Sequence, residues 1–106
     1  MTIRFASLGS GSEGNALLVA SGRTRILIDC GFGLQDTTSR MERLGVSAEQ
    51  LSGIVITHEH GDHIRGVARL ARKYKLPVWL THGTLHSQLK AFADVAHLHE
   101  IDPHRV

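Results

Sequence analysis

The chain has 106 residues, with 12 lysines and arginines against 10 aspartates and glutamates, and 8 histidines. This length permits one domain with a modest core, and so mild a charge gives no indication by itself of a nucleic-acid partner. The single cysteine, Cys30, excludes an intrachain disulfide, as is typical of a reducing cytoplasm. No apolar run approaches the ~20 residues that cross a bilayer, and no signal peptide is recognisable. We therefore expect a cytoplasmic protein that does not enter the membrane.

Apolar periodicity predicts the following elements in chain order. Alternation predicts strands over residues 3–8, 15–20 and 24–29, the last two joined by a tight turn. Helical spacing predicts a helix over 34–44 that ends at Gly45, then a strand over 53–56 and a helix over 64–75. A strand over 78–80, a helix over 84–92 and a strand over 95–99 complete the chain. Hairpin-linked strands followed by helix–strand units predict an α+β or α/β layered structure with a mixed sheet.

The segment of residues 57–63 places potential metal ligands at the end of the strand over 53–56. These ligands are His58, His60, Asp62 and His63. Imidazole suits zinc and similar metals, whereas carboxylate also suits harder ions such as manganese. The end of a buried strand is where α/β proteins usually place their chemistry. The H-x-H-x-D-H spacing therefore predicts a metal centre, and Asp62 excludes the H-E-x-x-H pattern of zincins because it stands where that pattern needs its second histidine.

A glycine-rich turn precedes this segment. Residues 9–14 match G-x-G-x-x-G, and Asp29 follows Gly9 by twenty residues, as in a dinucleotide fingerprint. Residues 15–29 fit a hairpin and leave no room for the crossover helix that the fingerprint needs, so we interpret the glycines as a tight turn. Its polar groups are possible phosphate contacts: Ser10, Ser12 and Asn15. Asp29 is either a turn residue or, as we favour, a carboxylate that orients a ligand histidine.

Arginines follow the histidine segment on the predicted helix. Arg65, Arg69 and Arg72 are spaced i, i+4 and i+7. Such a face is most often simply solvated, but a polyanionic substrate could use it as a backbone contact. Arg65 is the candidate phosphate contact among them because it lies next to the histidine segment.

Asp29 at a strand end, followed by His58-x-His60-x-Asp62-His63, resembles the metallo-β-lactamase superfamily. The opening Gly9-Ser10-Gly11-Ser12-Glu13-Gly14-Asn15 resembles its bacterial YycJ/WalJ-type branch, whose members are regarded as DNA exonucleases. The resemblance implies an αββα sandwich, of which residues 1–106 would form the N-terminal half as one partial domain. It also implies two divalent metal ions, zinc or manganese. His58 and His60 would bind one ion and Asp62 and His63 the other, with Asp29 supporting the loop, while the family's remaining ligands come from its C-terminal half.

This resemblance implies a metal-dependent hydrolase, most specifically a phosphodiesterase or DNA exonuclease. A hydroxide shared by two metals would attack the phosphorus, and Asp62 would be catalytic, as a metal ligand that also accepts a hydrogen bond from the nucleophile. A thioester, lactone or β-lactam hydrolase would use the same loop. Another alternative is a truncated, non-catalytic metal-binding fragment. Half of a sandwich would expose an apolar face, so we expect a homo-oligomer.

Overall fold

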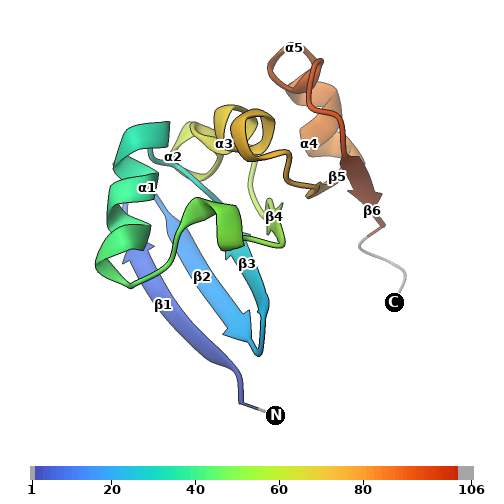
Figure 1. The fold of residues 1–106 in the computed structure, drawn as a ribbon. Coiled ribbons are helices and arrows are strands. Elements are labelled where there is room, and N and C mark those ends of the chain that lie inside the picture. The colour runs from blue at the N-terminus through green and yellow to red at the C-terminus, as the bar shows by residue number, and fades with distance from the viewer. Residues whose placement is uncertain (1, 103–106) are drawn as a thin grey trace.

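The computed structural model describes residues 2–102 and is built around one six-stranded sheet in the order β1-β2-β3-β4-β5-β6 (Figure 1). The strands are β1 (Arg4–Gly9), β2 (Ala16–Ser21), β3 (Thr24–Ile28), β4 (Gly53–Val55), β5 (Val78–Thr81) and β6 (Leu98–Ile101). The helices are α1 (Leu34–Arg43), a 3-10 turn η1 (Ala48–Gln50), α2 (Gly61–Ile64), α3 (Val67–Tyr74), α4 (His82–Ser87) and α5 (Leu89–Phe92). This is the α+β class with a mixed sheet that the sequence predicts.

The sheet changes from antiparallel to parallel at β3. Strands β1, β2 and β3 pair antiparallel, whereas β3, β4, β5 and β6 run parallel to one another. The β2–β3 hairpin turns at Gly22, whose φ of +60° favours glycine. The parallel strands are connected through the helices, which brings the carboxyl ends of β3, β4 and β5 to the same edge of the sheet. That edge carries the histidine segment.

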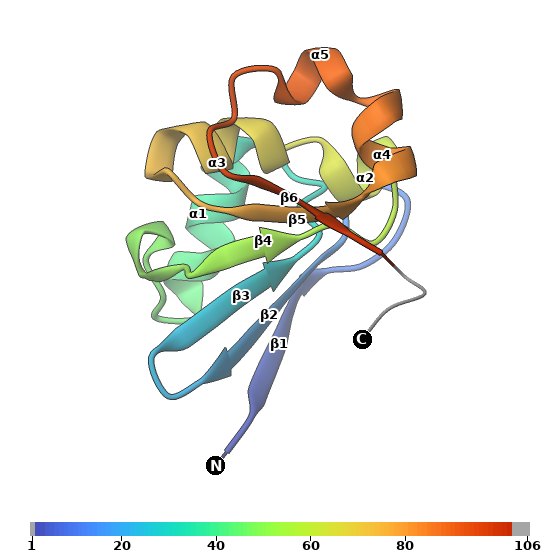
Figure 2. The same ribbon diagram turned by 90° about the vertical axis from the view of Figure 1, so that its right-hand side faces the viewer.

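One face of the sheet forms the core. A single register row across the strands is apolar, and it consists of Ala6, Leu18, Leu27, Ile54, Val78 and Leu98. Helices α1 and α3 cover this face, lying behind the sheet in Figure 2. Met41 of α1 and Val67 and Leu70 of α3 are each fully buried there. The alternation of the strands and the helical spacing thus converge on one core.

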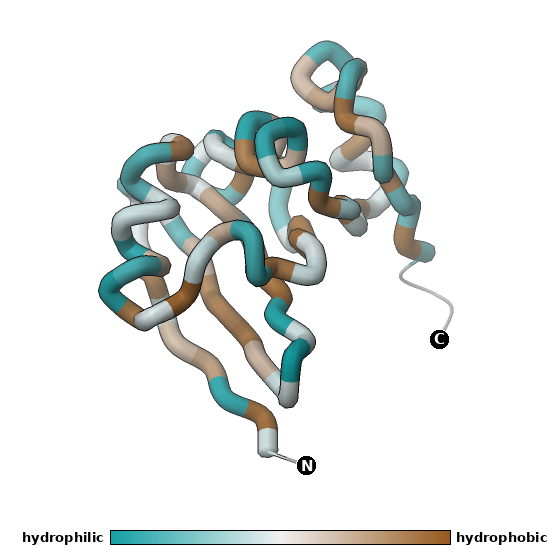
Figure 3. The backbone as a smooth tube through the Cα atoms, viewed as in Figure 1, coloured by the Kyte–Doolittle hydropathy of each residue, from teal (hydrophilic) through white to brown (hydrophobic). Residues whose placement is uncertain are grey.

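The opposite face of the sheet has an apolar row but no covering layer among residues 2–102. Its central row is Leu17, Ile28, Val55 and Trp79, all half-buried. Hydrophobic residues follow one another along β2 and β3 (Figure 3). Phe5 of β1 aligns with Val19 on this face and is 73% exposed. No helix of the described residues is long and apolar enough to cross a membrane.

The structure differs from the predicted elements mainly after the histidine segment. The helix predicted over 64–75 is interrupted, because Gly66 packs its backbone against the chain leaving β3. Its amide donates to the Cys30 carbonyl at 2.9 Å, and a Cβ on Gly66 would lie 1.9 Å from the Phe32 carbonyl oxygen. The helix predicted over 84–92 is likewise divided at Gln88, and the last strand lies at 98–101 rather than 95–99.

Candidate metal centre

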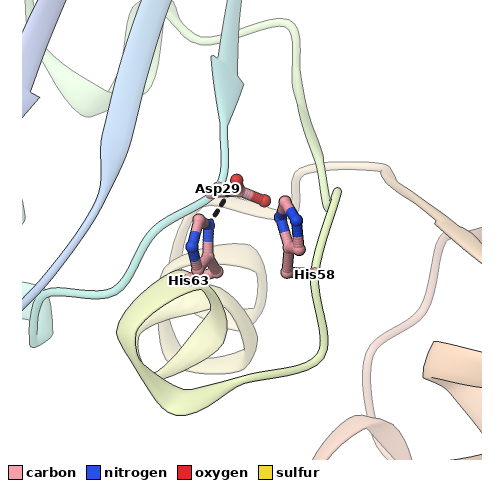
Figure 4. Close-up of side chains that lie close together, drawn as sticks. All are labelled: Asp29, His58 and His63. Carbon is pink, nitrogen blue, oxygen red and sulfur yellow. Dashed lines mark hydrogen bonds and ion pairs between the residues drawn. The ribbon is translucent and has the colours of Figure 1, made fainter. Parts of the chain in front are cut away.

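Asp29 joins the ends of two neighbouring parallel strands. It follows β3, and its amide donates to the Val55 carbonyl of β4 at 2.8 Å. Its backbone is left-handed, with φ of 63°, a conformation that aspartate tolerates better than most residues. The side chain is buried and points toward the segment that leaves β4 (Figure 4). The turn after β3 therefore delivers a buried carboxylate to the histidine segment.

Both carboxylate oxygens of Asp29 are used. Oδ1 accepts the Thr57 amide at 2.7 Å, and Oδ2 accepts the Thr57 hydroxyl and lies 2.7 Å from His63 Nδ1. The Thr57 Oγ1 also lies 2.8 Å from His58 Nδ1. Because the hydroxyl proton goes to Asp29, His58 Nδ1 must be the donor in that contact. A proton on Nδ1 of His58 and of His63 leaves the Nε2 lone pair of each ring free for a metal.

Asp62 lies beside the free nitrogen of His63. Its Oδ2 is 3.6 Å from His63 Nε2, and two ligands bound to one ion at 2.0–2.2 Å are separated by roughly 3–4 Å. Asn15 holds this carboxylate by donating from Nδ2 to Oδ2 at 3.0 Å, while the Asn15 amide donates to the Asp62 carbonyl at 2.7 Å. Asp62 and His63 are thus arranged as a pair that one ion could join.

The side chains of Asp29, His58 and His63 form the tightest potential ligand group among residues 2–102, with one ligand atom of each within 4.8 Å of the others. The rings of His58 and His63 have centroids 4.5 Å apart (Figure 4). His60 is placed differently. It precedes α2 and is exposed, and its side chain makes no hydrogen bond, ion pair or ring contact with the described residues. The imidazoles of His58 and His63 and the carboxylate of Asp62 form a donor set that suits zinc or another divalent metal.

The glycine-rich turn supports the centre through Asn15. Asn15 Oδ1 accepts the Gly11 amide at 3.0 Å, and Nδ2 donates to the Gly11 carbonyl at 2.7 Å. This compact turn positions Asn15 against Asp62, a role that the sequence did not indicate, and Asn15 as a phosphate contact stays a prediction. Ser10 and Ser12 are exposed on the same turn.

Cys30 is close to the centre in sequence but belongs to the core. Its Sγ lies 3.1 Å from Thr37 Oγ1, and the thiol is fully buried. Burial raises the pKa of the Cys30 thiol, and the hydrogen bond between Cys30 and Thr37 opposes the rise less strongly. A neutral, buried thiol is a poor metal ligand, so Cys30 is a packing residue of the core.

The arginine face is only partly available to a substrate. Arg72 donates to Asp94 at 3.0 Å and to the Ala91 carbonyl at 3.2 Å. Arg65 is exposed and, with Gln88, lines a cleft of about 240 Å³ between the histidine segment and α5. The Arg65 guanidinium therefore lies beside the candidate centre, and it forms no hydrogen bond or ion pair with residues 2–102.

Replacing Asp29 with asparagine is expected to lower metal affinity about 10–100-fold, the usual loss when a group that orients a ligand histidine is removed. The asparagine amide cannot accept a hydrogen bond from Thr57 and from His63 as two carboxylate oxygens do. Zinc titration in competition with a chelator measures the change. Asp36→Asn on α1 is the matched control, because Asp36 pairs with Arg40 on the surface. Equal affinities of both variants and the parent chain would contradict the role of Asp29.

Comparisons with known proteins agree with this geometry. The sequence profile of the Metallo-beta-lactamase superfamily matches residues 9–104. Exodeoxyribonuclease YycJ of Bacillus anthracis is 40% identical over 84 residues, which are 79% of this chain and 32% of that protein. Exodeoxyribonuclease WalJ of Streptococcus pneumoniae is 37% identical over 81 residues, 76% of this chain and 30% of that protein. The chain thus spans about a third of the length of these relatives.

The fold is also similar to that of solved structures. The metallo-beta-lactamase fold protein YhfI from Bacillus subtilis superposes with a TM-score of 0.75 at 20% identity, covering 97% of this chain and 46% of that one. At this identity, the similarity concerns the fold alone.

Proposed function

Because the chain belongs to the metallo-β-lactamase superfamily of metal-dependent hydrolases, we propose that it contributes the first ligand set of a phosphodiesterase, most specifically a DNA exonuclease. The observation that carries this proposal is the arrangement of His63, which lies between Asp29 at Nδ1 and Asp62 at Nε2. The names of its exonuclease relatives support the choice of substrate.

We assign the ligands as the family's pattern implies. His58 and His60 hold one divalent ion, zinc or manganese, and Asp62 and His63 hold a second. Bound ions of this kind supply a water of lowered pKa and stabilise charge on the phosphoryl oxygens. The free Nε2 atoms of His58 and His63 support the assignment, whereas His60 needs a change of side-chain orientation to join them.

Other residues of the chain orient the metal ligands or bind the substrate. Asp29 and Thr57 hold the rings of His58 and His63 in their ligand orientation. Asn15 holds Asp62, which we propose accepts a hydrogen bond from the nucleophile. The exposed side chains of Ser10, Ser12 and Arg65 are the proposed contacts with substrate phosphates, because charged and hydroxyl donors of this kind bind DNA phosphates.

The experiment is hydrolysis of linear DNA by the metal-loaded chain, with an acyl thioester and a β-lactam as comparison substrates. Hydrolysis of DNA alone is the expected result. Turnover of the thioester or the β-lactam without DNA hydrolysis would contradict a nuclease and indicate a hydrolase of that other substrate class. Metal bound without turnover of any substrate would indicate a non-catalytic metal-binding fragment.

We also propose that a second copy of this chain covers the open face of the sheet. The central row of Leu17, Ile28, Val55 and Trp79 is only half-buried, and the matched structure of YhfI has more than twice the length aligned here. Light scattering is expected to give the mass of a dimer at micromolar concentration, and Val19→Lys is expected to shift it to a monomer, because a charge would be buried in the interface. A monomeric parent chain would contradict self-association.

A further inference from the structure

A second group of metal-ligating side chains lies on α4 and β6, outside the candidate centre. His82 and His86 are four residues apart on α4, so both side chains lie on one face of the helix. Their rings are stacked, with centroids 6.2 Å apart and an angle of 22° between planes. Strand β6 runs beside β5, which leads directly into α4. This places Glu100 next to the helix, with Oε1 3.3 Å from His82 Nδ1.

We propose that His82, His86 and Glu100 form a second, surface binding site for a divalent transition-metal ion, with zinc as the expected occupant. Two imidazoles four residues apart on a helix bind zinc in known metalloproteins, and a carboxylate is a common third ligand. Three protein ligands leave one coordination position for water. The proposed site shares no side chain with the histidine segment, and it does not depend on hydrolysis.

The side chains must move to hold an ion, because the ligand atoms of His82, His86 and Glu100 do not yet all lie within 4.8 Å of one another. Ligand nitrogens around zinc lie roughly 3–4 Å apart when each is bound at 2.0–2.1 Å, so the two rings must approach from their present stacking. All three side chains are exposed. The exposed fraction is 79% for the side chain of His82 and 52% for that of Glu100, and His86 is exposed as well. Side chains in this environment change rotamer without disturbing the core. Exposure also spares the carboxylate the cost of burial before an ion binds.

A simple surface ion pair would account for His82 and Glu100 but not for His86. The second imidazole adds nothing to an exposed ion pair, whereas it supplies the third ligand of a metal site. The helix that carries both histidines also contacts the candidate centre, since Ser87 Oγ donates to Glu59 Oε2 at 2.9 Å. An ion bound here would therefore tie β6 and α4 together beside the histidine segment.

The test counts zinc per chain by mass spectrometry after equilibrium dialysis at a fixed concentration of free zinc. His86→Gln is expected to weaken binding at this site about tenfold or more, because losing a ligand costs at least as much as losing a group that orients one. The zinc content should therefore fall below that of the parent chain, by one equivalent at most. Glu100→Gln should also lower the zinc content. His97→Gln is the matched control, because His97 is exposed and its side chain makes no hydrogen bond, ion pair or ring contact with the described residues.

A second readout separates this site from the candidate centre. Copper(II) added to isotope-labelled protein should broaden the NMR signals of α4 and β6 in the parent chain and in a His58→Ala variant, but not in His86→Gln. Zinc content and broadening that are the same in His86→Gln and in the parent would overturn the proposal. Loss of broadening at α4 in His58→Ala would overturn it as well, because the ion would then belong to the histidine segment.

Discussion

Replacing Asp62 with alanine is expected to abolish metal-dependent phosphodiester hydrolysis while leaving the fold intact. In the proposed function, the carboxylate is both a metal ligand and a hydrogen-bond acceptor for the nucleophile, so its removal should lower the rate by about 10³-fold or more. The fold should persist because the interaction between Asn15 and the main chain remains. The backbone amide of Asn15 donates to the Asp62 carbonyl, and this bond does not depend on the Asp62 side chain.

The measurement combines hydrolysis rate, metal content and thermal unfolding of the same preparations. Asp62→Ala should retain the unfolding temperature within a few degrees and should bind less metal than the parent. Asp94→Ala is a suitable control, because it removes an exposed carboxylate that pairs with Arg72 outside the candidate centre. Unchanged metal-dependent activity in Asp62→Ala would exclude Asp62 as a catalytic residue, and an unfolded variant would show that its side chain is structural.

The strands were predictable from sequence because burial alternates along each of them. Leu18 and Leu27 face the core and lie opposite each other in the β2–β3 pair, and this alternation is visible in the sequence without knowledge of the partner strand. The break between α2 and α3 was not predictable. Its cause is the close approach of Gly66 to Phe32, a tertiary contact between segments distant in sequence, and helical periodicity contains no information about such contacts.

The candidate centre was predictable in its ligand types but not in its supporting contacts. The H-x-H-x-D-H spacing concentrates metal ligands at a strand end, and Asp29 at the end of β3 could be paired with them because parallel strands bring their ends together. Asn15 is separated from Asp62 by 47 residues, and only the docking of the glycine-rich turn reveals their contact. Thr57 belongs to the histidine segment, but the role of its hydroxyl depends on the positions of Asp29 and His58 in the fold.

A second large effect is expected at Gly31, where two segments of the candidate centre touch through their backbones. A Cβ on this residue would lie 1.8 Å from the Asp62 carbonyl oxygen and 2.9 Å from the Asn15 amide nitrogen. Neither neighbour is the end of a flexible side chain, so the backbone itself must move. The Gly31 amide also donates to the Asn15 carbonyl at 3.0 Å, and any displacement strains this hydrogen bond.

Gly31→Ala is therefore expected to destabilise the chain by about 1–3 kcal/mol, the usual cost of overpacking, and to weaken metal binding because Asp62 is pushed away from His63. Denaturant unfolding and zinc titration measure the two effects. Gly83→Ala is the matched control: nothing lies within 4 Å of a Cβ at that helical position, and alanine there should be neutral or stabilise the chain by up to about 1 kcal/mol. Unfolding midpoints and zinc affinities that are equal in the two variants would show that the contact between Gly31 and Asp62 does not shape the centre. A destabilised Gly31→Ala chain with normal zinc affinity would separate the packing of this backbone from the placement of the ligands.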